Sequence, residues 1–208
     1  MVGDSKKGPE AGKGLGRGFT LAIAAAVLVA GAAALYVIAG AALKPASSTA
    51  LQPLAKGAMA KLQERSPTPP PAAGFVDAQG KLVRIADLKG QVLVVNLWAT
   101  WCAPCVKEMP TLAALQKAYE GKGVKVVAVS IDAPKDTDKA KAFIAGHAPL
   151  AFYQDGTLEL PFAFKPPAPG FPTTILFDRS GQERARLAGD ADWSSPEARA
   201  VIDRLLAS

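Results

Sequence analysis

The chain has only two cysteines and one histidine. Because Cys102 and Cys105 are separated by two residues, a bond between them would close almost no loop and would add little structural stability. A tetrahedral zinc site needs further ligands, which His147 alone cannot supply. Covalent haem attachment needs a histidine directly after the second cysteine, and Val106 occupies that position. These shortages exclude a disulfide scaffold, a zinc site and a haem site, and they favour exchange chemistry at the cysteine pair.

The chain also has no block of basic residues. Its formal net charge is +6, but four basic and two acidic residues lie before residue 18, which leaves +4 spread over the remainder. Nucleic-acid binding needs basic residues gathered in a patch or stripe. We therefore expect no nucleic-acid partner.

Charged residues are absent from Phe19 to Leu43, a run of 25 residues. At about 1.5 Å per residue, such a helix can cross a hydrocarbon core of roughly 30 Å. A cleaved secretory signal has an apolar region of only about 7–15 residues, although Ala30-Gly31-Ala32 resembles a cleavage pattern. We expect a transmembrane anchor over 19–43, and a disordered cytoplasmic segment over 1–18, because basic residues precede the run. The remainder would face the periplasm from a bacterial inner membrane.

Residues 44–71 are expected to form a linker. Leucine and alanine recur at helical spacing over 50–64, which predicts a short amphipathic helix. Ser66 to Pro71 is rich in proline and predicts a stiff, extended segment that does not join a core. The folded domain is therefore expected to span residues 72–208.

Strand and helix patterns alternate along this domain, which predicts an α/β fold with a mixed sheet. Pro110 is expected to bend the helix that contains it, and Asp136 to cap another helix. The expected strands cover 75–77, 81–84, 92–97, 124–131, 150–153, 173–178 and 182–187, and the expected helices cover 85–90, 102–119, 136–145, 158–164 and the segment after Ser195 and Pro196.

The two cysteines lie where a buried strand, Val92–Leu97, gives way to a helix. Cys102 is therefore expected at a helix N-terminus, where unpaired N–H groups and the helix dipole favour a thiolate. Because the thiolate is the nucleophilic form, we interpret Cys102 as the nucleophile and Cys105 as the resolving thiol. No cofactor and no metal are expected.

Trp101-Cys102-Ala103-Pro104-Cys105, Pro110 and a proline that begins a later strand resemble the thioredoxin superfamily. Residues 95–102, 105–110 and 170–174 are similar to its membrane-anchored TlpA-like branch, and segments 55–60 and 187–193 extend this resemblance over most of residues 50–208. The resemblance implies a thioredoxin-like three-layer fold and a periplasmic thiol:disulfide reductase. Its implied clients are proteins with cysteine pairs, such as copper-site or haem-protein maturation factors, and its implied electron donor is a membrane thiol carrier.

The resemblance also implies roles for residues around the cysteines. Pro172 corresponds to the cis-proline of the family, which would leave the backbone of Phe171 free to pair with a client. Trp101 and Pro104 are expected to contact clients, whereas Trp98 is expected in the core. From the residues alone, His147 is expected in a loop without a catalytic role. Arg179, Arg184 and Arg186 are expected on a solvated hairpin face, with contact to an acidic client as the alternative.

Glu108 lies three residues after Cys105, on roughly the same helix face. We interpret it as the acid/base that manages the proton of Cys105, because thioredoxins use a buried aspartate in the preceding strand, where Asn96 cannot titrate. The alternative is a solvated acid that only complements the helix N-terminus.

Three other functions are compatible with parts of the sequence. A disulfide-donating oxidase uses the same motif, but Ala103-Pro104 offers no charge to stabilise a thiolate strongly. A thiol peroxidase would have threonine at position 99, where alanine stands. A redox-inert, membrane-tethered adaptor would not need its cysteines.

Overall fold

The computed structural model describes residues 50–208, which belong to one compact unit, Thr49–Ser208. The predicted cytoplasmic segment and membrane anchor lie outside the described residues. Within residues 50–208, no helix is both long enough and apolar enough to cross a bilayer. The strands are β1 Leu62–Thr68, β2 Gly74–Asp77, β3 Leu82–Arg84, β4 Val92–Trp98, β5 Val124–Ser130, β6 Tyr153–Gln154, β7 Thr173–Phe177 and β8 Glu183–Ala188. The helices are α2 Ala103–Ala118, α3 Thr137–Ala145, α4 Glu159–Ala163 and α5 Pro196–Leu206, with 3₁₀ turns η1 Gln52–Leu54, η2 Gly57–Met59, η3 Ile85–Leu88 and η4 Pro134–Asp136.

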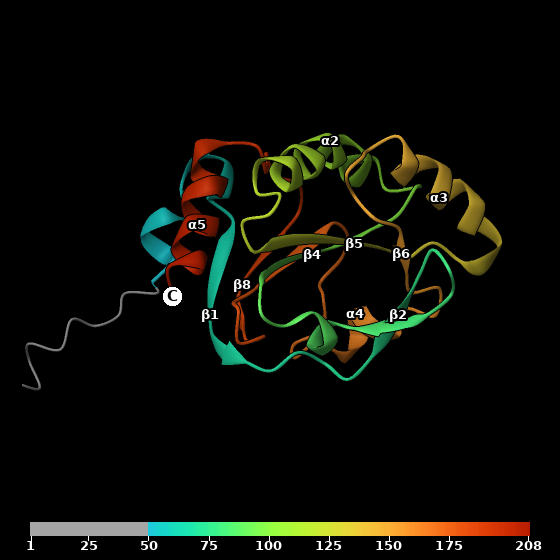
Figure 1. The fold of residues 1–208 in the computed structure, drawn as a ribbon, viewed down its shortest axis with the longest axis horizontal. Coiled ribbons are helices and arrows are strands. Elements are labelled where there is room, and N and C mark those ends of the chain that lie inside the picture. Colours follow the sequence, from blue (N-terminus) through green and yellow to red (C-terminus); the bar gives the residue numbers. More distant parts are fainter. Residues whose placement is uncertain (1–49) are drawn as a thin grey trace, which may run out of the picture. The chain divides into compact units, whose positions relative to one another are not determined.

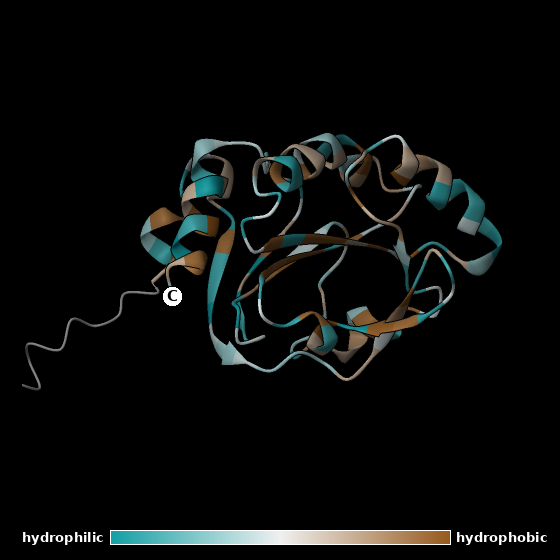
Figure 2. Cartoon of the chain, in the orientation of Figure 1, coloured by the Kyte–Doolittle hydropathy of each residue, from teal (hydrophilic) through white to brown (hydrophobic). Residues whose placement is uncertain are grey.

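The strands form one mixed sheet in the order β1-β8-β7-β4-β5-β6-β2-β3. β4, β5 and β6 run parallel, whereas β7 pairs antiparallel with β4. β4 is buried along its whole length, and its side chains alternate between two cores. One core lies against α2, α3 and α5 and the other against α4, so the fold has the three layers that Figure 1 shows. In Figure 2 hydrophobic colour follows the central strands, as this double burial requires.

Residues 50–71 differ from the sequence prediction. The expected amphipathic helix over 50–64 is wrong: η1 and η2 are followed by the strand β1. Pro53 cannot donate an intrahelical hydrogen bond, and Gly57 has a φ of +53°, so neither supports a continuous helix. Leu51 and Met59 are fully buried in the core beside α5, and β1 pairs antiparallel with β8. The folded unit thus begins some twenty residues before the boundary expected near residue 72.

Most of the other expected elements are confirmed. The hairpin β2–β3, the strands β4 and β5, and the hairpin β7–β8 lie where the sequence patterns predicted them. Ser195 caps α5 by accepting a hydrogen bond from the N–H of Ala198 at 3.2 Å. α2 continues as one helix through Pro110. The expected cap at Asp136 is wrong, because Asp136 precedes α3 without a side-chain capping hydrogen bond.

The parallel arrangement of β4, β5 and β6 brings their carboxyl ends to one edge of the sheet. The cysteine motif follows β4 at this edge, and β7, which runs in the opposite direction, begins there directly after Pro172. Segments distant in the sequence therefore meet at the carboxyl ends of the strands, where open α/β sheets place their ligand sites.

Candidate active site

A disulfide joins Cys102 and Cys105, with their Cα atoms 5.3 Å apart. Cys102 precedes the first residue of α2, and its Sγ accepts a hydrogen bond from the N–H of Cys105 at 3.4 Å. Cys102 is 6% exposed, whereas Cys105 is fully buried. The helix dipole and the free N–H groups of α2 would stabilise a thiolate at Cys102 in the reduced protein. Only the first sulfur therefore combines an activating position with contact to solvent.

Trp101 and Pro104 lie next to the cysteines in the chain, and Phe171 contacts Trp101 from the segment before β7. Trp101 is 63% exposed, and its ring meets that of Phe171 edge to face at a centroid distance of 6.2 Å. The Phe171–Pro172 peptide bond is cis, as the sequence resemblance implied. In the described part of the chain, no backbone–backbone hydrogen bond uses the N–H or C=O of Phe171. Pro104 is also exposed, whereas Phe171 is half-buried and Pro172 is buried.

Glu108 is buried beneath this surface, with 2% of its area exposed. Its Oε1 accepts a hydrogen bond from Nδ2 of Asn96 at 2.8 Å. Its Oε2 accepts from the N–H of Ala191 and from Nε1 of Trp193, both at 3.2 Å. Asn96 also donates to Oγ1 of Thr174 at 2.9 Å, which ties the carboxyl group to β4 and β7. The alternative of a solvated acid at Glu108 is therefore wrong.

Burial, with a smaller contribution from the nearby charge of Asp190, raises the pKa of Glu108 from its ordinary 4.5 to about 7. The hydrogen bonds from Asn96, Ala191 and Trp193 oppose this rise because they favour the ionised form. A carboxyl group with a pKa near neutrality can both accept and donate a proton at the pH where thiols exchange. Glu108 thus has the proton affinity that an acid/base residue needs.

The sequence did not identify Trp193 and Ala191 as partners of Glu108. They lie in the segment between β8 and α5, more than 80 residues after Glu108, and they reach it only because α5 packs beside α2. No local pattern encodes this contact. The sequence did contain one signal that Glu108 is buried: a polar residue, Asn96, within an otherwise apolar strand, which needs a polar partner such as Glu108.

Glu108 also lines a hollow of about 530 Å³ between α2, the end of η2 and the segment before α5. Lys61, Lys107 and Asp190 line it as well, and Lys107 pairs with Asp190 at 3.6 Å. Neither Trp101 nor Phe171 borders this hollow. The little exposed surface of Glu108 therefore faces a different opening from the one beside the disulfide.

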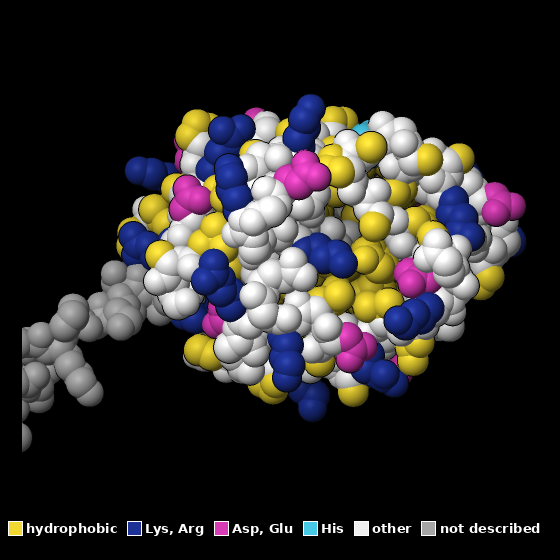
Figure 3. Space-filling model, in the orientation of Figure 1, with side chains coloured by type: hydrophobic (Ala, Val, Ile, Leu, Met, Phe, Trp, Pro, Cys, Tyr) yellow, Lys and Arg dark blue, Asp and Glu magenta, His cyan; other side chains and the backbone are white. Residues whose placement is uncertain are grey.

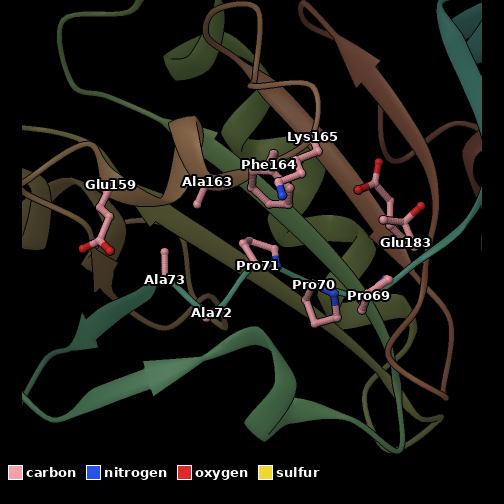
Figure 4. A pocket seen from close by; sticks show the side chains of 11 residues that line it. Pro69, Pro70, Pro71, Ala72, Ala73, Glu159, Ala163, Phe164, Lys165 and Glu183 are labelled. Carbon is pink, nitrogen blue, oxygen red and sulfur yellow. The ribbon is translucent and has the colours of Figure 1, made fainter.

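Figure 4 shows a second hollow, of about 420 Å³. Pro69, Pro70 and Pro71 line it opposite Phe164, with Glu183 at its edge. None of the residues expected at the active site borders it. Its proline wall shows that the segment expected to be a free linker packs against the domain.

Arg179 is exposed, as expected for a solvated hairpin, but the expectation is wrong for Arg184, which is half-buried, and for Arg186, which is buried. Arg186 is 6% exposed, donates from Nε and Nη2 to Glu183 and packs on the ring of Phe164. Arg184 pairs with Asp178 at 3.1 Å. The face drawn in Figure 3 shows Lys and Arg side chains scattered among Asp and Glu, without a patch of one sign.

His147 and Trp98 take no part in the site. Nδ1 of His147 lies 2.8 Å from the backbone oxygen of Phe143, whose ring contacts the fully buried Trp98. Within residues 50–208, no three Cys, His, Asp or Glu side chains lie close enough together to hold a metal ion.

A disulfide at the amino end of a helix, beside a proline that begins a strand of a mixed sheet, defines a thioredoxin-like thiol-disulfide oxidoreductase. The family model described as Redoxin matches residues 63–202. The chain therefore belongs to the Redoxin family, and its relatives place it among the TlpA-like members of the thioredoxin superfamily.

Several curated relatives carry the name thiol-disulfide oxidoreductase ResA. Those of Bacillus thuringiensis subsp. konkukian and Bacillus anthracis are each 34% identical over 125 residues, which cover 57% of this chain and 68% of the relative. Among solved structures, a thiol:disulfide interchange protein of Chlorobium tepidum TLS is 28% identical, with a TM-score of 0.56 over 69% of this chain and 99% of the other. A secreted thiol-disulfide isomerase of Corynebacterium glutamicum, 20% identical with a TM-score of 0.60 over 70% and 92%, shares the fold.

Proposed function

We propose that this oxidoreductase reduces disulfides of client proteins, with Cys102 as the attacking thiol and Cys105 as the resolving thiol. The observation that carries this assignment is the unequal exposure of the two cysteines at the start of α2. Cys102 reaches solvent beside Trp101, whereas Cys105 lies fully buried behind it. A client disulfide can approach only the first sulfur.

The exchange balances in two steps. The Cys102 thiolate attacks one sulfur of the client disulfide, which forms a mixed disulfide and releases a client thiolate. The Cys105 thiolate then attacks the Cys102 sulfur, which closes the enzyme disulfide and releases the second client thiolate. Two electrons pass from the enzyme dithiol to the client, and the two protons of the dithiol end on the client thiols.

Glu108 manages one of these protons in our proposal. It lies one helical turn after Cys105 on α2, and its pKa of about 7 suits both acceptance from the Cys105 thiol and return to a leaving thiolate. Because its exposed surface faces the hollow with Lys61 and Lys107, the carboxyl group can exchange protons with solvent while a client covers Trp101.

The client contact consists of Trp101, Pro104, Phe171 and Pro172. The exposed ring of Trp101 gives apolar contact area, and the free backbone groups of Phe171 can pair with an extended client segment. Ala103 and Pro104 bring no charge between the cysteines, which favours reduction of clients over donation of disulfides. We propose cysteine pairs of copper-site or haem-protein maturation factors as the clients and a membrane thiol carrier as the electron donor.

The proposed location is the periplasmic face of a bacterial inner membrane, with the anchor over residues 19–43. Because the folded unit begins near residue 50, only residues 44–49 would connect the anchor to it. Six residues span at most about 20 Å, so the domain would stay close to the bilayer and to membrane-bound partners. A linker that ran to residue 71 would have allowed a much longer reach.

Trapping of the mixed disulfide tests the assignment of the cysteines. The Cys105→Ser variant should accumulate a covalent complex with a peptide that contains a Cys-x-x-Cys disulfide, because the second step is blocked. The Cys102→Ser variant should form no such complex. A complex that forms through Cys105 would overturn the assignment, and full function of the double variant in cells would favour the redox-inert adaptor.

A further inference from the structure

Asp132 is a second fully buried carboxylate near the dithiol, and the exchange mechanism does not use it. It follows β5 at the carboxyl edge of the sheet. Oδ1 and Oδ2 accept from the backbone N–H of Thr100 at 3.2 and 3.0 Å, and Oδ1 also accepts from Oγ1 of Thr100 at 2.7 Å. Oδ2 accepts from Oγ of Ser130 at 2.8 Å. Three donors thus converge on this carboxylate, and two of them belong to the residue two positions before Cys102.

Thr100 is the second residue of the turn that presents Cys102. This turn is closed by a 3.2 Å hydrogen bond from the N–H of Cys102 to the oxygen of Ala99. A closing bond of this kind leaves the N–H of the second residue without a partner inside the turn. Asp132 supplies that partner, and its charge makes the hydrogen bonds stronger than neutral ones.

The backbone around Asp132 is fixed from other directions as well. Its own N–H donates to Oγ of Ser130 at 3.1 Å, and its backbone oxygen accepts from Nε2 of Gln154 at 2.9 Å. The preceding residue, Ile131, donates to the oxygen of Trp98 at 2.8 Å. Because these hydrogen bonds fix the backbone of Asp132, its carboxylate can hold the Thr100–Cys102 turn in place.

We propose that Asp132 is a positioning residue that holds the Thr100–Cys102 turn in the geometry required for attack by Cys102. This inference rests on the proposed role of Cys102 as nucleophile. Thiol attack needs the incoming disulfide aligned with the attacking sulfur, and small misplacements of reacting atoms lower rates by large factors. Loosening the turn should therefore lower the rate of attack and leave the client contact by Phe171 unchanged, because that residue belongs to another segment.

The test compares Asp132→Asn with Ser130→Ala, which removes both hydrogen bonds between Ser130 and Asp132 but leaves the carboxylate and its two Thr100 donors in place. With a small-molecule disulfide as substrate, whose reduction does not depend on the Trp101 contact, Asp132→Asn should lower kcat about tenfold with KM changed less than twofold. Ser130→Ala should lose stability in urea but keep kcat within about twofold. Equal losses of kcat in the two variants, or unchanged kcat in Asp132→Asn, would overturn the proposal.

A second pair of variants covers the case in which Asp132→Asn does not fold. Thr100→Val removes the hydroxyl donor, whereas Thr100→Ser keeps it. We expect kcat to fall several-fold for the valine variant and to stay near that of the parent for the serine variant, and equal rates would contradict the proposal. Failure of the proposed function can be told apart from failure of the Asp132 proposal. If Cys102 were not the nucleophile, the Cys102→Ser variant would retain activity, whatever the Asp132 and Thr100 variants do.

Discussion

Replacement of Glu108 by glutamine gives a quantitative test of the buried carboxyl group. One pKa unit corresponds to about 1.36 kcal/mol. The rise from 4.5 to about 7 therefore means that ionising Glu108 costs roughly 3 kcal/mol more in the folded protein than in the unfolded chain. Glutamine has nearly the same shape and does not titrate, so the Glu108→Gln variant lacks this cost.

The sign of the pH dependence follows from proton linkage. Between pH 4.5 and about 7 the folded protein keeps the proton on Glu108 while the unfolded chain loses it. Stability therefore falls as pH rises through this window. The contribution of protonated Glu108 to the free energy of unfolding is fully present below pH 4.5 and is lost once the pH has passed about 7. The Glu108→Gln variant should not show this loss.

Urea unfolding of the oxidised proteins is the suitable assay, because disulfide-bonded cysteines do not titrate. The difference in unfolding free energy between Glu108→Gln and the parent should shift in favour of the variant by roughly 3 kcal/mol between pH 4.5 and pH 8. Other titrating groups cancel in this difference. A difference that stays constant over the whole range would refute the reasoning.

The structure indicates how glutamine can be accommodated. Oδ1 of Asn96 has no hydrogen-bond partner among the described residues. If the Asn96 amide turns over, this oxygen can accept from the new amide at position 108, while the other end of the glutamine accepts from Trp193 and the Ala191 N–H. The variant should therefore fold, and its reduction of clients should be about 100-fold slower because it cannot transfer a proton.

Three further variants test the packing and the client surface. Met59→Ala should cost about 2–5 kcal/mol in urea unfolding, because the side chain is fully buried, whereas the exposed Lys56→Ala should cost almost nothing. Glu183→Ala should cost about 3–5 kcal/mol, because it leaves the buried Arg186 without its carboxylate, and an unchanged midpoint would contradict this. Trp101→Ala should raise KM for a disulfide peptide roughly tenfold and leave the rate with a small-molecule disulfide unchanged. Equal effects on both substrates would argue against a client contact.

The central part of the fold was predictable because its signals are local. Continuous apolar runs gave β4 and β5, and the Ser195-Pro196 start and apolar spacing gave α5. The cysteine pair was placed correctly because a strand end followed by a helix fixes its position at the helix N-terminus. Family resemblance, rather than any base rate, gave the cis bond before Pro172.

The parts that the sequence did not predict depend on contacts between distant segments. Helical spacing over 50–64 was misleading because Leu51 and Met59 are buried beside α5 without forming a helix. β1 exists because β8 offers a free edge for pairing, which no pattern within residues 62–68 reveals. The hydrogen bonds of Glu108 with Trp193 and of Asp132 with Thr100 likewise arise from the tertiary fold.

The rate of alkylation of Cys102 as a function of pH tests the central claim most directly. The reduced protein, with iodoacetamide as the probe, gives the pKa of the accessible thiol. Because Cys102 lies at the N-terminus of α2, we predict a pKa below about 8.5, the value of an ordinary cysteine, and modification of Cys102 before Cys105. A pKa at or above that value, or modification of Cys105 first, would contradict the account.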